Sequence, residues 1–101
     1  MTFLIKKPMN RGDIVTIKLT SAEELIARLD ADTPTHYEIS RPMTLSYSQQ
    51  GIALTPWLIT ADNDSNLQIV KERVMVITTT MKQAADQYIQ GTTGIQTVNK
   101  L

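Results

Sequence analysis

Strand-forming residues fill the run Asp13-Ile14-Val15-Thr16-Ile17-Lys18-Leu19 near the beginning of the chain. Apolar and polar side chains alternate along it, and several of them are β-branched, which is typical of a strand with one buried face. Gly12 stands directly before it, where a turn is needed. The sequence therefore predicts a half-buried β-strand here, and this strand needs a partner.

The next segment, Glu23 to Leu29, allows two interpretations. A cap at Ser21 with Glu24 three residues later has the spacing of a helix capping box. However, a polar break begins at Asp30, and the short segment that remains rarely forms a stable helix. We therefore predict a second strand that pairs with the first as a hairpin.

Three longer segments continue the β pattern. His36 to Tyr47 has apolar residues at alternate positions, and Pro42 indicates a bend or bulge within this third strand. Ile52 to Ile59 is predicted as a fourth strand, and Leu67 to Val70 as extended chain. Val74 to Thr79 is apolar at both odd and even positions, which predicts a last strand buried on both faces.

Helical periodicity occurs in one segment, near the end of the chain. Apolar residues recur there at i, i+3, i+4, i+7 and i+8, and Gly91 follows at the position of a C-terminal cap. A helix over about residues 81–90 is predicted to pack on the sheet through Met81, Ala85, Tyr88 and Ile89. Residues 92–101 are mostly polar and are predicted to form a tail.

Composition limits the class of protein. The chain has 101 residues, ten basic and ten acidic side chains and no cysteine, which suits a single domain over residues 1–101 with its sheet at about 12–80. The sequence offers no apolar run long enough to span a membrane and does not begin with the pattern of a secretory signal, so we expect a cytoplasmic protein. With no net charge, any nucleic-acid site must be a local patch.

The charges are unevenly distributed along the chain. Residues 1–18 hold four basic side chains against one acidic, whereas residues 23–38 hold five acidic side chains against one basic. Residues 71–82 are basic again, with Lys71, Arg73 and Lys82 against Glu72. Two interpretations remain open: the ends of the sheet differ in sign, or the charges form a mixed, solvated surface.

Catalytic and metal-binding motifs are missing from the sequence. The single histidine cannot form a metal site built on a pair of histidines, and no phosphate-binding glycine loop occurs. The loop that begins at Asp62 has the first ligands of a calcium loop, but Leu67 stands where a glycine must turn the chain and Arg73 where the last glutamate belongs. We therefore expect no cofactor, no metal and no enzyme activity.

The segment from Val70 to Ile77 resembles a motif of the Sm and Sm-like family. The second Sm motif ends as apolar-Arg-Gly-x-Val-x-x-Ile, and this chain is similar in register with Val70-Lys71-Glu72-Arg73-Val74-Met75-Val76-Ile77. Lys71 falls in the arginine position and Glu72 in the glycine position. The first motif is matched in part, by Gly12, Val15, Ile17, Leu19, Ala27-Arg28-Leu29, Asp32, His36 and Ile39.

A phage-type and marine-metagenome branch of small Sm-like proteins is the most similar part of that family. Three runs carry this resemblance, namely residues 51–58, 73–77 and 87–95, and it covers about residues 12–95. The resemblance implies a mainly β fold: a small, strongly bent five-stranded antiparallel Sm-like (SH3-like) barrel with one C-terminal helix. It also implies the cytoplasm of a bacterium or of a phage-infected host cell.

The resemblance further implies a homo-oligomeric ring of about five to seven copies, in which the fourth strand pairs with the fifth strand of the next copy. Such rings bind single-stranded RNA or DNA and act in RNA or DNA processing or as RNA chaperones. The implied RNA-binding residues are Asp32, His36, Tyr37, Lys71 and Arg73. An assembly or adaptor ring that binds a protein partner and no nucleic acid is the alternative, and neither hypothesis involves a membrane.

Overall fold

The computed structural model describes residues 9–92, so most of the predicted tail and the basic residues Lys6 and Lys7 lie outside the described part. The described chain is mainly β with one C-terminal helix, as predicted. Its elements are β1 Ile14–Leu19, β2 Glu24–Asp32, β3 His36–Ser48, β4 Gly51–Pro56, β5 Leu67–Val70, the 3₁₀ turn η1 Lys71–Arg73, β6 Val74–Thr79 and α1 Lys82–Thr92.

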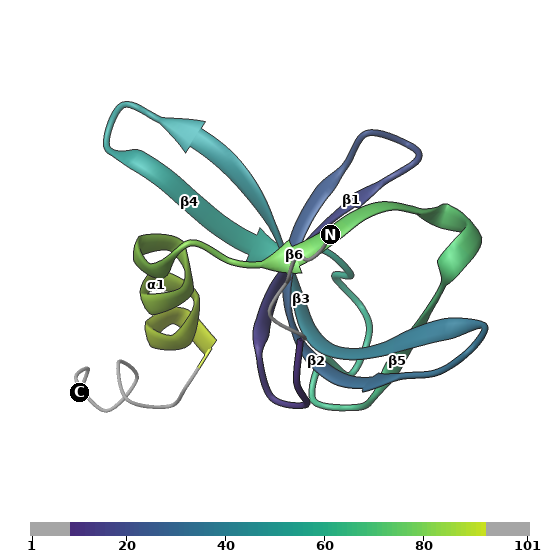
Figure 1. Cartoon of the computed structure of the whole chain (residues 1–101). Helices are drawn as coiled ribbons and strands as arrows, with labels where there is room; N and C mark the ends of the chain where they lie inside the picture. The colour runs from purple at the N-terminus through teal and green to yellow at the C-terminus, as the bar shows by residue number, and fades with distance from the viewer. Residues whose placement is uncertain (1–8, 93–101) are drawn as a thin grey trace, which may run out of the picture.

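The sheet is antiparallel, with the strand order β4-β3-β2-β1-β6. Strand β3 is thirteen residues long and has two further partners: its first residues pair with β5, and its last residues pair with β4. Figure 1 shows the β3–β4 hairpin extending away from the part of the sheet that holds β2 and β5. The predicted five-stranded barrel is thus a strongly bent, unclosed sheet, in which β5 is the additional strand.

The bend in β3 lies where the sequence predicted it. Ile26 is opposite Met43 and Arg28 is opposite Ser40, so β3 holds one extra residue there. Arg41 has a φ of 52°, a left-handed conformation that one type of β-bulge uses. Pro42 is buried, and its carbonyl accepts a hydrogen bond from Trp57 N at 3.0 Å. Beyond the bulge, β3 still pairs with β2 at Met43 and Thr44 and then continues into the hairpin with β4.

The core lies on one face of β1, β2 and β3. Val15, Ile17 and Leu19 are buried along β1, which confirms the predicted alternation. The strand interpretation of residues 23–29 is also confirmed, although β2 continues to Asp32. The remaining residues of the buried cluster come from β2, β3 and β5: Leu25, Ala27, Leu29, Ile39 and Ile69.

Burial of β6 on both faces is wrong for the single chain. Met75 is 61% exposed and Val76 is 51% exposed, whereas Val74 and Ile77 are half-buried against the core. The reason is position: β6 pairs with β1 on one side and stands at the edge of the sheet on the other. Strand β6 therefore carries more apolar side chains than the single chain buries.

The helix is present, but its packing differs from the prediction. Tyr88 is buried, and its hydroxyl donates to the carbonyl of Arg41 at 2.7 Å. Met81 and Ile89 are 65% and 44% exposed, so their predicted burial is wrong. Gly91 lies inside α1 and does not cap it. The helix is attached at the β3 bulge through Tyr88 and through the guanidinium of Arg41, which donates to the carbonyl of Thr92.

Candidate functional site

Two turns that are distant in sequence meet beside β5. His36, at the start of β3, pairs with Val70, the last residue of β5. The backbone N–H of Lys71 donates to the carbonyl of Thr35 at 3.0 Å. Because of this contact the β2–β3 turn and η1 lie side by side, and an open hollow forms there, lined by Pro34, Thr35, Val70, Lys71 and Glu72.

Three of the five predicted site residues form one cluster at this junction. The Nζ atom of Lys71 lies 2.6 Å from Oδ1 of Asp32 and 4.7 Å from the centroid of the Tyr37 ring. Asp32 and Tyr37 are opposite each other on β2 and β3. The hydrogen bond from Lys71 to Asp32, together with the negative charge of that carboxylate, raises the pKa of Lys71 above its ordinary value. The lysine is therefore fully protonated at neutral pH, and Asp32 compensates its charge.

His36 is beside this cluster in sequence but makes different contacts. Its Nδ1 atom lies 3.1 Å from the hydroxyl oxygens of Thr33 and Thr35, and its Nε2 atom lies 3.4 Å from Oε2 of Glu38. Successive residues of a strand point to opposite faces of the sheet. The side chain of His36 is therefore directed away from the face on which Tyr37 contacts Lys71. The contacts of His36 are thus with its own turn and strand.

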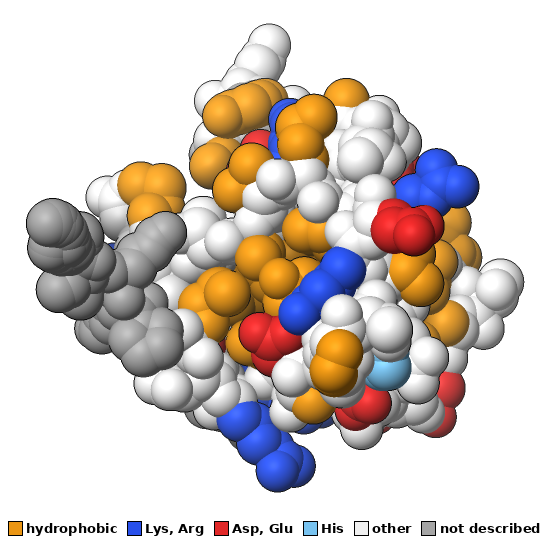
Figure 2. All heavy atoms as spheres, turned by 45° about the vertical axis from the view of Figure 1, so that its right-hand side comes forward, with side chains coloured by type: hydrophobic (Ala, Val, Ile, Leu, Met, Phe, Trp, Pro, Cys, Tyr) orange, Lys and Arg blue, Asp and Glu red, His pale blue; other side chains and the backbone are white. Residues whose placement is uncertain are grey.

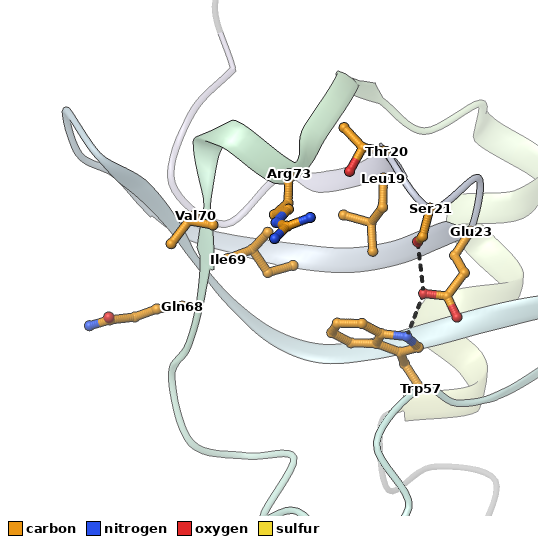
Figure 3. A pocket seen from close by; sticks show the side chains of 9 residues that line it. All are labelled: Leu19, Thr20, Ser21, Glu23, Trp57, Gln68, Ile69, Val70 and Arg73. Carbon is orange, nitrogen blue, oxygen red and sulfur yellow. Dashed lines mark hydrogen bonds between the residues drawn. The ribbon is translucent and has the colours of Figure 1, made fainter.

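Arg73 is separated from Lys71 although the two belong to the same 3₁₀ turn. It lines a second hollow together with Trp57, Glu23 and residues of β1 and β5 (Figure 3). Among residues 9–92 no ion pair involves Arg73, whereas Asp32 holds Lys71. Trp57 is not among the five residues predicted for the site. Its position directly after Pro56, where β4 ends, is the only local signal, and that signal does not reveal its neighbours.

Charged side chains of both signs are interspersed on the face that carries these hollows (Figure 2). Glu38 lies beside His36, and Asp32 beside Lys71. This face therefore corresponds to the mixed surface, and the described residues form no continuous basic patch on it. Any anion bound here must be held by a few well-placed groups.

The loop that begins at Asp62 holds hydrogen bonds of its own and an ion pair to β3, from Asp64 to Arg41 at 2.8 Å. Asp62 accepts hydrogen bonds from the backbone N–H of Asp64 and from the hydroxyl of Ser65, each at 3.1 Å. Within residues 9–92 no three His, Cys, Asp or Glu side chains are placed to hold a metal ion together.

No family model matches this chain, and no curated protein is significantly similar to it in sequence. In the described part of the chain, no helix has the length and apolar character that crossing a bilayer requires.

Proposed function

We propose that the protein is an Sm-like, ring-forming module that binds single-stranded RNA or DNA. The observation that carries this proposal is the cluster of Asp32, Tyr37 and Lys71 at the junction of two turns. An ammonium group has three N–H donors, so Lys71 can contact a phosphate oxygen while it remains bonded to Asp32. The second oxygen of Asp32 can accept a hydrogen bond from the edge of a base.

Self-association is supported by the edges of the sheet. Val76 on β6 and Val70 on β5 are apolar and about half exposed, because each strand has one side with no partner strand in the described structure. An exposed apolar edge strand is a template for pairing with another chain. We infer that β6 of one copy adds to the sheet of the next copy, which would pair the backbone edge of β6 that one chain leaves open.

Strand β5 is a better acceptor for β6 than the segment 52–59, which the sequence suggested. On the outer edge of β4, the carbonyl of Ile52 already accepts a hydrogen bond from Gln87 at 2.7 Å. Strand β5 also directly precedes η1 and β6, and its last residue, Val70, begins the stretch that is similar in register to the second Sm motif. The proposed ladder therefore joins β5 of one copy to β6 of its neighbour.

Repetition explains how a neutral chain can bind a polyanion. In a ring, each copy contributes one Lys71 cluster to the same nucleic-acid strand. Several modest contacts on one strand raise the apparent affinity well above that of one contact. Since each neutralised phosphate releases counterions, binding should weaken as the salt concentration rises.

The test measures binding of short fluorescent RNA strands to the full chain by anisotropy over a range of salt concentrations. Lys71→Ala should weaken binding and flatten the slope of log K against log salt by about 0.7 for each phosphate of a single strand that the lysine no longer neutralises. The matched control is Lys82→Ala, because Lys82 is also ion-paired but is 86% exposed on α1. Equal binding and equal slope for the parent and Lys71→Ala would contradict the proposed site.

The adaptor ring remains the second candidate function, and one observation favours it. Asp32 compensates the charge of Lys71 at 2.6 Å, which lowers the local attraction for phosphate. A stable oligomer that binds no single-stranded RNA or DNA at low salt would select this adaptor over the nucleic-acid module.

A further inference from the structure

The second hollow combines an aromatic ring, a carboxylate and a guanidinium that no ion pair within residues 9–92 engages. We propose that it is a second nucleotide subsite, which takes a base with an exocyclic amino group from the same single strand that binds at Lys71. This inference rests on the proposed function and deepens it. Figure 3 shows Trp57, Glu23 and Arg73 around the hollow, with Leu19 and Ile69 between them.

Trp57 supplies the stacking surface. Its indole is half-buried and packs against the core cluster, so the ring is held from behind. Its Nε1–H donates to Oε1 of Glu23 at 3.3 Å, which restricts rotation of the ring. A base that stacks on a held indole gains contact without ordering a flexible side chain.

Glu23 supplies the selectivity. Its Oε1 atom accepts from Trp57 and from the hydroxyl of Ser21, whereas no hydrogen bond to its Oε2 atom occurs within residues 9–92. A carboxylate oxygen only accepts, so it favours bases that present an amino group: adenine, cytosine and guanine. Uracil and thymine present a carbonyl oxygen where cytosine and adenine present the amino group, and their ring N3–H is the one donor on that edge, so the carboxylate binds them less well.

Arg73 supplies the contact to the sugar-phosphate backbone. It is exposed, and none of the ion pairs among residues 9–92 involves it. Lys71 and Arg73 are two residues apart on one 3₁₀ turn, yet each lines a different hollow. A strand that crosses η1 would meet Lys71 on one side and Arg73 on the other, and neither cation would compete with the other for one phosphate.

Charge also decides between this occupant and an apolar segment of a second copy. Burial of Glu23 and Arg73 under an apolar segment would remove two charges from water without new partners, and that is costly. A nucleotide instead offers an amino group to the first and a phosphate to the second. Its chemistry therefore complements both rims of the hollow.

The experiment uses the fluorescence of Trp57, the single tryptophan in the chain. The full-length protein is titrated with short oligo(A), oligo(C) and oligo(U) of equal length at one salt concentration. Oligo(A) and oligo(C) should quench the tryptophan strongly, whereas oligo(U) should bind with little quenching. Arg73→Ala should weaken oligo(A) binding about tenfold, as should Trp57→Leu, while Trp57→Phe retains most of the affinity.

Glu23→Gln tests the selectivity with little change of volume. It should reduce the preference for oligo(A) over oligo(U), because an amide can also donate to a carbonyl oxygen. Unchanged preference in this variant, together with parental binding by Arg73→Ala, would overturn the subsite. If Lys71→Ala still weakened binding in that case, the proposed function would survive alone. If the parent bound no oligonucleotide at all, both would fail.

The same fluorescence detects a second copy as the occupant. The emission of Trp57 is measured without nucleic acid while the protein is diluted over the concentration range in which the oligomer dissociates into monomers. Constant emission supports an open hollow that a nucleotide enters. A shift that follows dissociation of the oligomer would mean that a second copy covers Trp57, and it would overturn the subsite.

Discussion

The hydroxyl of Tyr88 attaches the helix to the sheet, and its removal should weaken the fold measurably. Tyr88 is 2% exposed, and its hydroxyl donates to the carbonyl of Arg41 at 2.7 Å. Tyr88→Phe keeps the ring and removes only this donor. A net hydrogen bond contributes about 0.5–1.5 kcal/mol, and a carbonyl left unpaired adds to the cost. We therefore expect the free energy of unfolding to fall by about 1–2 kcal/mol.

The same hydroxyl predicts a dependence on alkaline pH. Burial raises the pKa of Tyr88 to about 12, although the nearby charge of Arg41 opposes this in part. In the unfolded chain tyrosine ionises near pH 10, so between about pH 10 and 12 the folded state holds more protons than the unfolded state. Stability should therefore be full below pH 10 and fall as the pH rises through this window, by roughly 2 kcal/mol in all.

The assay is urea unfolding followed by circular dichroism at a fixed protein concentration, because dissociation of an oligomer would otherwise shift the midpoint. The parent and Tyr88→Phe are compared from about pH 8 to about pH 12. The difference between them should shrink above pH 10, since the variant has no group to ionise there. Tyr47→Phe is the control, because Tyr47 is 86% exposed. A parallel decline in the parent and Tyr88→Phe would refute the reasoning.

Three further changes test the sheet edge, the helix and the charged cluster. Val76→Pro removes a backbone donor from β6, so light scattering should show monomer or aggregate; an unchanged oligomer would contradict the proposed ladder. Ile89→Asp should cost less than about 1 kcal/mol in thermal unfolding, because Ile89 is 44% exposed, and a larger loss would mean that an assembly buries it. Asp32→Asn should tighten RNA binding at low salt, because it removes the negative charge beside Lys71 while the amide oxygen can still accept from a base; weaker binding would contradict this charge argument.

The local patterns of the sequence predicted the elements and one irregularity. Alternation along residues 13–19 identified the buried face of β1, and the short polar-bounded segment after Glu23 was a strand because it is too short for a stable helix. Pro42 indicated the bulge, because proline lacks the donor that a regular ladder needs. Each of these depends on neighbours in sequence, and each is confirmed.

Burial that depends on distant partners could not be predicted in the same way. The apolar pattern of β6 gives no information on whether one chain or two supply its cover, and the single chain leaves Met75 and Val76 exposed. The period of α1 identified Tyr88 on the inner face but not how few residues reach the sheet, because the bulge at Arg41 holds the helix by polar contacts.

The candidate site was also predicted only in part, because the neighbours of its residues are distant in the sequence. The resemblance to the Sm family implied Asp32, Tyr37 and Lys71, and these three residues lie together. It also assigned Arg73 to that site, but η1 directs this residue to a separate hollow beside Trp57. That separation depends on the turn geometry of three residues and on a tryptophan that follows another strand, and neither is visible in a linear motif.

The central claim is that several copies form one closed ring around or against one nucleic-acid strand. Native mass spectrometry of the full-length protein, alone and with a short oligo(A), tests both parts in one measurement. We predict a single discrete oligomer at low protein concentration, and a mass increase of one oligonucleotide per oligomer when the strand is added. Monomer as the main species, or an oligomer whose mass does not change with oligonucleotide, would contradict the account.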